Sequence, residues 1–508
     1  MNRKFIIYFL SAILILSFIF VDTQSFASNP DYEVWLADQG NTQEITVNNP
    51  KGSYGGKVRI YAGKDLEKNP PVSNPLVLDV VSDLFPMAQS TTGDNVNRIH
   101  GITATPDFKY ATLNFVASGH LGIVNTKTKK PVCLFRTTQT STGWQNHMSL
   151  VSSDYSKILI ANQNGKMLER VNILKNAQGN VTEFQYDAAS SLDLVGGIGR
   201  VFSQPIAVDV DSSDDISCTK TGFVADGQST VTPNGIAKQA TGIRPNNTLI
   251  CPVVTDNSKH AYLTLGGGGM FVADITTTPM QIVAEYDTTV YRTSGCGGNS
   301  VNGSMFLNSG TPAPNVSEFT VYQFSQDFPL APNFNPPNQP LPIAVWADSA
   351  NGQTIPNNNR DAHGATIIKD KYLHQFDRVR NNVEVFRVDK TPFEYETSYS
   401  LKNSGVCIST KNAMTQDDPT PDLGDSPFKD KRVYIALRGT LPQSVAHAAV
   451  GSCPGLGIID LDGNKTGKLT HVLPTMIESG DGKDNLSDPH AAIVIYHTES
   501  LKHTIGKA

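Results

Sequence analysis

The sequence lacks the patterns that mark several common functional classes. Its charge is low and balanced, with 41 basic and 47 acidic residues, and no basic patch indicates a nucleic-acid surface. The six cysteines lie far apart, and no CxxC pair points to a zinc ribbon or a thiol redox motif. Beyond Val21, no apolar run is long enough to cross a bilayer. We therefore expect neither a nucleic-acid partner nor a membrane span in the mature chain.

Motifs of common enzyme classes are missing as well. The run Leu265-Gly-Gly-Gly-Gly269 is not followed by the Lys-Ser or Lys-Thr that a phosphate-binding loop requires. Ser300 stands in Gly-Asn-Ser-Val-Asn, which lacks the second glycine of a nucleophile elbow, and there is no HExxH. Patterns of helical period are scarce, whereas short apolar runs alternate with Gly, Asn and Pro turns. This pattern predicts an all-β fold.

The first 27 residues have the features of a secretory signal. Arg3 and Lys4 precede an apolar run from Phe5 to Val21, and small residues around Ala27 fit a cleavage site. We expect the mature protein to be periplasmic or secreted, with an uncleaved membrane anchor as the alternative. In an oxidising compartment the six cysteines predict up to three structural disulfides, whose pairing the sequence leaves open.

One pattern returns in three places with the same internal distance. A histidine leads, a short β-type run follows, and an aspartate closes the run, at His100–Asp107, His147–Asp154 and His363–Asp370. A second apolar run follows each aspartate, so each unit predicts a strand, a tight turn and a second strand. Ala446-His447 and Pro489-His490 share the opening, so five of the eleven histidines occupy one repeated position.

The repeat predicts a seven-bladed β-propeller. Successive possible unit starts lie 47, 57, 45, 114, 84 and 43 residues apart, and a period near 40 to 50 residues is typical of propeller blades. They are His100, His147, Gln204, Leu249, His363, His447 and His490. The last start leaves too little chain for a blade, so we expect N-terminal strands from residues 31–62 to join the C-terminal blade and close the ring. We expect a single domain over residues 28–508, with loop insertions near 297–345 and 412–430.

The repeated histidines predict a metal site in the propeller channel. The innermost strand of each blade lines the channel, so residues at equivalent starts converge at one mouth. Neutral imidazoles favour copper, zinc, nickel or iron, and the absence of Asp or Glu from the repeated position argues against calcium and magnesium. More than four histidines exceed the needs of one tetrahedral zinc, which favours a multinuclear copper cluster. Alternatively, each histidine bonds an aspartate of its own blade, although about 23 Å of strand separates the two.

In this pattern the chain resembles seven-bladed propellers of the Tyr-Val-Thr-Asn (YVTN) type, and within them the histidine-ringed copper propellers. That group includes the nitrous oxide reductase propeller domain and thiocyanate dehydrogenase. The resemblance implies oxidation or reduction of a small inorganic sulfur or nitrogen compound, with electrons passing to an external carrier. It implies a copper cluster held by His100, His147, His363, His447 and His490. The chain has neither paired histidines nor a cupredoxin domain, which argues against nitrous oxide reduction.

Two charged residues precede repeated histidines by two positions, a spacing that returns to the same face of a strand. They are Arg98 and Asp361. Arg98 is predicted to hold an anionic substrate, and Asp361 to act as a base or to orient a histidine. Ordinary surface salt bridges are the alternative for both residues.

The sequence therefore favours an exported copper-dependent oxidoreductase resembling thiocyanate dehydrogenase. Two other functions stay open. One is a non-catalytic propeller that binds a protein or a glycan. The other is a lactonase-like hydrolase with one divalent metal, which requires carboxylates among its ligands.

Overall fold

The computed structural model describes most of the chain between Asp31 and His497. The described residues are 31–40, 55–195, 200–225, 231–232, 235–236, 244, 246–292, 295–309, 319–328, 340–347, 360–411, 413–427, 431–443, 450–479, 482 and 484–497. Their secondary structure is nearly all β, so the predicted fold class is confirmed at this level. The helical turns are α2 (Gly63–Leu66), η1 (Val80–Leu84), α3 (Ala88–Thr92) and η2 (Ala188–Ser190).

Most strands belong to antiparallel groups of four that follow one another along the chain. The first three groups are β4 (Ile99–Ala104), β5 (Tyr110–Phe115), β6 (His120–Asn125) and β7 (Pro131–Arg136); β8 (Asn146–Val151), β9 (Lys157–Asn162), β10 (Met167–Lys175) and β11 (Val181–Asp187); and β17 (Leu249–Val254), β18 (His260–Leu265), β19 (Met270–Asp274) and β20 (Gln281–Tyr286). The next three are β21 (Gly298–Val301), β22 (Ser304–Ser309), β23 (Thr320–Ser325) and β24 (Ala344–Ala347); β25 (Ala362–Ile368), β26 (Tyr372–Asp377), β27 (Asn382–Arg387) and β28 (Glu394–Ser400); and β29 (Pro421–Asp425), β30 (Arg432–Leu437), β31 (Gly455–Asp462) and β32 (Thr466–Pro474).

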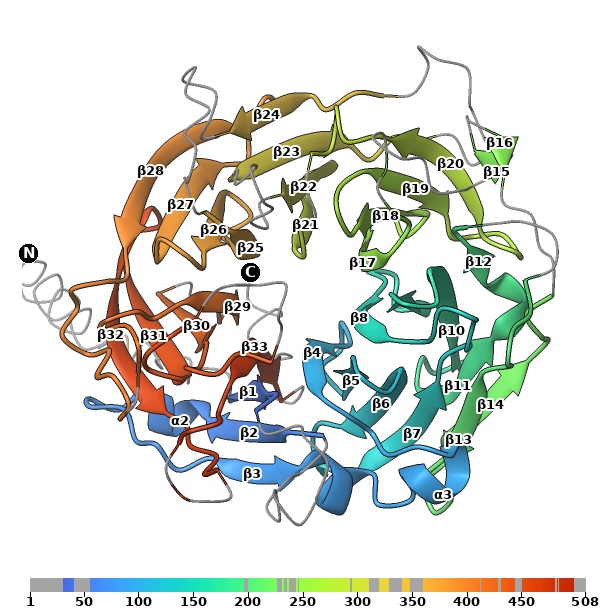
Figure 1. The fold of residues 1–508 in the computed structure, drawn as a ribbon, viewed down its shortest axis with the longest axis horizontal. Helices are drawn as coiled ribbons and strands as arrows, with labels where there is room; N and C mark the ends of the chain where they lie inside the picture. The colour runs from blue at the N-terminus through green and yellow to red at the C-terminus, as the bar shows by residue number, and fades with distance from the viewer. Residues whose placement is uncertain are drawn as a thin grey trace, which may run out of the picture.

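The two ends of the described chain meet in one further group of strands. It contains β33 (Pro489–Tyr496), β1 (Tyr32–Asp38), β2 (Lys57–Ala62) and β3 (Leu76–Asp79), in that order. Strand β1 runs antiparallel to β33, with Val34 opposite Val494. Figure 1 shows the groups arranged around a common axis, with β4, β8, β17, β21, β25, β29 and β33 nearest the centre. This arrangement brings residues far apart in the sequence to one channel.

Several short strands pair with these groups. Strand β13 (Ile206–Asp209) pairs with β7, β14 (Ser217–Thr221) runs parallel to β11, and β12 (Leu192–Asp193) pairs with β10. Strands β15 (Val231–Thr232) and β16 (Gly235–Ile236) pair with each other. Gln204 was predicted to begin an innermost strand, and this prediction is wrong, because the strand that follows it pairs with β7 at the outer edge.

The repeated turn after the innermost strand has a local cause. In the first unit, the Thr105 hydroxyl donates to Asp107 Oδ1 at 2.8 Å, and the Asp107 carboxylate accepts from the Lys109 amide at 3.1 Å. Ser152 and Asp154 repeat the hydroxyl–carboxylate bond in the second unit, at 2.6 Å. Such side-chain bonds to the turn favour a tight connection. The predicted strand, turn and strand after His100 and His147 are therefore confirmed.

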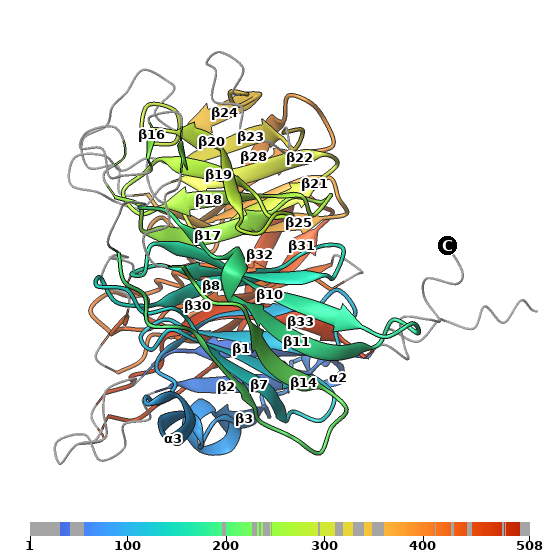
Figure 2. The ribbon, with the colours of Figure 1, turned by 90° about the vertical axis from the view of Figure 1, so that its right-hand side faces the viewer.

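Apolar side chains fill the space between neighbouring groups. One cluster joins Leu159 and Leu168 of the β8–β11 group to Leu263 and Phe271 of the β17–β20 group. Figure 2 shows these two groups one above the other in side view. Removing apolar surface from water is the main force that holds such faces together, at about 25 cal/mol per Å².

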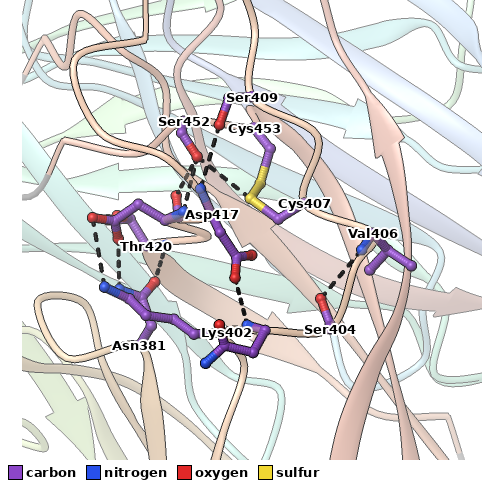
Figure 3. Close-up of a disulfide and its surroundings, with 12 residues drawn as sticks. Asn381, Lys402, Ser404, Val406, Cys407, Ser409, Asp417, Thr420, Ser452 and Cys453 are labelled. Atoms are coloured by element: carbon purple, nitrogen blue, oxygen red, sulfur yellow. Dashed lines mark hydrogen bonds and ion pairs between the residues drawn. A yellow bond between two sulfur atoms is a disulfide. The ribbon is translucent and has the colours of Figure 1, made fainter.

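Three disulfides link the six cysteines: Cys133–Cys218, Cys251–Cys296 and Cys407–Cys453. The prediction of three structural disulfides is confirmed, and they fit an oxidising compartment. Figure 3 shows Cys407–Cys453 beside the segment that leads into β29. There the Ser452 hydroxyl accepts from the Asp418 amide at 2.9 Å, and Asn381 Oδ1 accepts from the Thr420 amide. The segment just before Asp422 is thus tied to its surroundings.

Both segments that we expected to be loop insertions contribute strands. Strands β21–β24 lie within or at the edge of residues 297–345, and β29 lies within 412–430. The Pro-rich and Asp-rich sequence around these strands obscured them.

Residues 1–27 and His447 lie outside the described residues, so the signal peptide and that ligand stay predictions. Among the described residues, no helix is long and apolar enough to cross a membrane.

Candidate metal centre in the central channel

The structure brings four of the five predicted histidines together at the channel. His100, His147, His363 and His490, here called the histidine cluster, lie on β4, β8, β25 and β33. The rings of His100 and His490 stack with centroids 3.5 Å apart, and the His147 centroid is 4.6 Å from that of His100. The His363 ring lies 5.8 Å from His490, edge to face. All four side chains are buried.

Asp422 joins this cluster from β29, a position that the sequence reasoning missed. Its Oδ1 lies 3.3 Å from His363 Nε2, and its Oδ2 lies 3.8 Å from His490 Nε2. The ligand atoms of His363, Asp422 and His490 all lie within 4.8 Å of one another, and we call these residues the His–Asp–His triad. The argument that no carboxylate occupies the repeated position is therefore wrong.

Glycine allows the innermost strands to come this close. A Cβ added to Gly364 would lie 2.3 Å from the carbonyl oxygen of Asp422. A Cβ added to Gly101 would lie 2.4 Å from the Met148 sulfur. Gly101 and Gly364 directly follow His100 and His363, so the missing side chains let neighbouring innermost strands pack closely beside these two histidines.

Hydrogen bonds set the tautomers of three imidazoles. The Nδ1 atom of His490 donates to the His100 carbonyl at 2.8 Å, and that of His147 donates to the Ile250 carbonyl at 3.0 Å. His100 Nδ1 donates to Gln39 Oε1 at 3.1 Å. Because each Nδ1 carries the proton, each Nε2 presents a lone pair. The Nε2 atoms of His100 and His490 are buried and have no hydrogen-bond partner among the described residues.

The surroundings keep the cluster imidazoles neutral. Burial lowers the pKa of His147 to about 3, with His490 and Arg98 adding to the effect. Burial lowers the pKa of His490 to about 4, although the Asp422 carboxylate opposes it. Burial is the main cause that holds the pKa of His100 and of His363 well below the usual range, and neighbouring histidines and arginines add to the effect. Neutral imidazoles are the form that binds metal ions.

Asp422, by contrast, is held as a carboxylate. Burial alone would raise its pKa, but His490, Arg378 and Arg438 outweigh burial and lower the pKa below the usual range. Its Oδ2 accepts from Arg378 Nη1 at 3.3 Å and from Arg438 Nη1 at 2.8 Å. Its Oδ1 has no hydrogen-bond partner among the described residues and faces His363. The ionised carboxylate thus faces two imidazoles, with Oδ1 toward His363 and Oδ2 toward His490.

The two arginines extend the contacts of Asp422 to neighbouring strands. Arg378 donates through Nε and Nη2 to Asp361 Oδ2, at 2.8 and 2.6 Å. Arg438 forms a fork with Asp488, with bonds of 2.7 and 2.9 Å. Burial raises the pKa of Asp361 to about 6, while Arg378 acts in the opposite direction. Asp361 is therefore bound in a buried ion pair and does not form the surface salt bridge that was the alternative.

Arg98 lies at the edge of the histidine cluster. Its Nη1 donates to the Gln443 carbonyl at 3.0 Å, and its side chain is half-buried. Burial is the main cause of its lowered pKa, while the Asp488 carboxylate opposes the shift. Its charge helps to lower the pKa of His100 and of His147, and its predicted role in holding an anionic substrate stays a prediction.

A second group of possible ligands is already engaged in a covalent bond. His147, Cys251 and Cys296 offer atoms within 4.8 Å of one another. The two sulfurs form a disulfide, however, so neither is a thiolate that could bind a metal. The His–Asp–His triad is therefore the stronger metal site of the two.

No family model matches the chain, and no curated protein matches it. Three solved structures show a distant likeness in fold. A candidate 6-phosphogluconolactonase from Bacteroides fragilis is 11% identical, with a TM-score of 0.45, over 92% of this chain and 98% of that one. The periplasmic gluconolactonase of Pseudomonas aeruginosa is 12% identical, with a TM-score of 0.46, over 92% and 99%. The β-propeller domain of Cps50 (Swd1) from Myceliophteria thermophila is 10% identical, with a TM-score of 0.33, over 67% and 93%.

At these identities the likeness concerns the fold alone. The prediction of a copper-dependent oxidoreductase is wrong. The solved structures named above include a gluconolactonase and a candidate 6-phosphogluconolactonase. The site also differs from the expected ring of histidines, because its possible ligands include the ionised carboxylate of Asp422. Catalytic zinc sites combine imidazole and carboxylate ligands in this way.

Proposed function

We propose that the protein is a divalent-metal-dependent hydrolase that cleaves a small ester or lactone at the His–Asp–His triad. The observation that carries the proposal is the meeting of His363, Asp422 and His490, with ligand atoms within 4.8 Å of one another in a buried setting. Two imidazoles and one carboxylate form a donor set that catalytic zinc sites use, with a further position left for water or substrate.

The donor side chains fit such an ion in three respects. His490 Nε2 and Asp422 Oδ1 are buried polar atoms without a hydrogen-bond partner among the described residues. Their environment favours neutral imidazole and ionised carboxylate, which are the states that bind a cation. The Nδ1 bond of His490 to a backbone carbonyl fixes its ring, as ligands of metal sites require.

A divalent ion in this place would polarise the substrate carbonyl and make water a stronger nucleophile. The residues around the triad would have different roles in the reaction. His100 Nε2 can accept a hydrogen bond from the attacking water, since no described residue occupies it. The guanidinium of Arg98 would stabilise negative charge on the substrate as the bond breaks. Asp361 is a positioning residue, because it binds Arg378, which in turn binds Asp422.

We propose further that the fold is a seven-bladed β-propeller closed by the N-terminal strands. Seven innermost strands surround the channel, and the pairing of β1 with β33 supports a closing blade made from both ends of the chain. We also propose export to the periplasm or the exterior after removal of residues 1–27, which the three disulfides support.

Metal analysis combined with hydrolysis assays tests the function. We expect one zinc-type ion per chain, and hydrolysis of aryl esters or lactones that is lost with a chelator and restored by zinc. His363→Ala and His490→Ala should lose both the ion and the activity. His471→Ala, a half-buried histidine on β32, is the matched control and should keep both. A pure protein that lacks a bound divalent ion, or that hydrolyses these compounds equally well with chelator, would rule the proposal out.

A further inference from the structure

The channel next to the triad contains a small apolar cavity of about 160 Å³, here called the channel cavity. Its walls come from innermost strands around the channel. Lining side chains include Ile102, Met148, Val253, Ala365, Leu423 and Ile493. Among the described residues that line it, Asp425 is the one with a charged side chain, and its carboxylate accepts hydrogen bonds from the backbone amides of Val494 and Ser426. The walls therefore offer few free polar groups.

Several residues that line the channel cavity follow residues of the metal centre closely in the sequence. Met148 and Leu423 directly follow His147 and Asp422, and Ile493 lies three residues beyond His490. Because a strand rises about 3.3 Å per residue, the cavity begins beside the histidine cluster and extends roughly 10 Å along the channel. The cavity is thus lined by the same innermost strands, β25, β29 and β33, that carry the triad.

The burial of the lining residues indicates where the channel cavity opens. His363, Asp422 and His490 are fully buried at one end. Leu150, Ala365, Asp425 and Ile493, which lie further along their strands, are only half-buried. A molecule entering from that end would pass the apolar walls before it reached the triad.

We propose that the channel cavity binds the apolar acyl or alkyl part of the substrate, about six carbon atoms in size, and admits it to the triad. Ordered water needs several polar partners, which these walls do not supply, and an apolar cavity of about 150 Å³ is large enough for benzene or xenon. The role in substrate choice rests on the proposed hydrolase function. The binding of a small apolar molecule in the cavity does not depend on that function.

Xenon binding tests the cavity without reference to catalysis. Crystals of the full mature protein under xenon pressure should show xenon between Met148, Ala365 and Ile493. Ala365→Leu, which fills the space, should lose it. Ala177→Leu adds the same volume in an exposed turn and should leave xenon in place. Wild-type crystals without xenon in the channel would overturn the inference.

An ester series tests the role in substrate choice. For wild type we expect kcat/KM to rise from acetyl to hexanoyl esters and to fall for longer chains. Ala365→Leu should lower kcat/KM for the hexanoyl ester about tenfold or more and change the acetyl ester little, since one methylene group counts about 10-fold or more in a tight apolar pocket. Ile493→Ala should move the optimum to longer chains.

The outcomes separate the two proposals. Xenon binding without hydrolysis of any ester would support the cavity as an apolar site and reject the hydrolase. Hydrolysis with the same chain-length profile in wild type, Ala365→Leu and Ile493→Ala would reject the role of the cavity in substrate choice. Equal thermal stability of the variants and wild type shows that a changed profile does not come from misfolding.

Discussion

Replacing Asp422 by Asn tests the metal centre most directly, because it keeps the shape of the side chain and removes its charge. Asp422 is fully buried and accepts from Arg378 at 3.3 Å and from Arg438 at 2.8 Å. Removing one partner of a buried ion pair costs about 3 to 5 kcal/mol. A chain of this length unfolds with an entropy of about 1 kcal/mol/K, so the melting temperature of the metal-free protein should fall by about 3 to 5 °C.

The same substitution should abolish stabilisation by metal. Zinc at 100 times its Kd adds about 2.7 kcal/mol to the free energy of unfolding of a protein that binds it only when folded. For wild type this corresponds to a rise of about 3 °C in melting temperature. Asp422→Asn should show little or no rise at the same zinc concentration, because one of three ligands has lost its charge.

Differential scanning calorimetry at pH 7, with chelator and then with zinc, measures both effects. Asp389→Asn is the matched control, since Asp389 pairs with Arg387 near the surface and its side chain is 31% exposed. It should change the free energy of unfolding by less than about 1 kcal/mol and leave the zinc-dependent rise intact. If Asp422→Asn kept the full zinc-dependent rise, the carboxylate would not be a ligand.

Three further predictions concern stability. Burial lowers the pKa of His374 to about 4, so the unfolded chain takes up its proton first as the pH falls, and stability should fall between pH 6.5 and 4, by up to about 3 kcal/mol. His374→Gln should flatten this loss in urea unfolding measured at several pH values. Replacing Cys407 and Cys453 by Ser removes a bond across a separation of 46 residues, and should lower the free energy of unfolding in urea by about 4 kcal/mol. Gly364→Ala, whose Cβ would lie 2.3 Å from the Asp422 carbonyl oxygen, should cost about 1 to 3 kcal/mol and reduce the zinc-dependent rise in calorimetry.

Each of these predictions has an outcome that contradicts it. Equal pH dependence in wild type and His374→Gln would show that this imidazole is not buried in its neutral form. A double serine variant as stable as wild type would show that Cys407–Cys453 does not restrain the segment before β29. For Gly364, the control is Gly266→Ala, whose added Cβ would have its nearest neighbour at 3.4 Å. Equal effects of the two alanines would remove the argument from close strand approach.

The sequence by itself determined the β class and the convergence of the histidines. The repeated run from histidine to aspartate encodes two strands and a tight turn, because Thr105 and Ser152 bond the turn aspartates within a few residues. Local bonds of this kind can be predicted from residues that are neighbours in the sequence. Placing His100, His147, His363 and His490 at the start of innermost strands then needed only the assumption that the units surround one axis.

Only the tertiary structure decided which groups complete the centre. Asp422 lies in a stretch rich in Pro and Asp that reads as a loop, and it becomes a strand residue because β29 pairs with β30 and approaches β33 at Leu423. Its ionised state depends on Arg378 and Arg438, which come from other strands. The pairing of the cysteines and the channel cavity likewise follow from contacts between distant segments. Such contacts depend on how whole sheets pack, and no short stretch of sequence contains them.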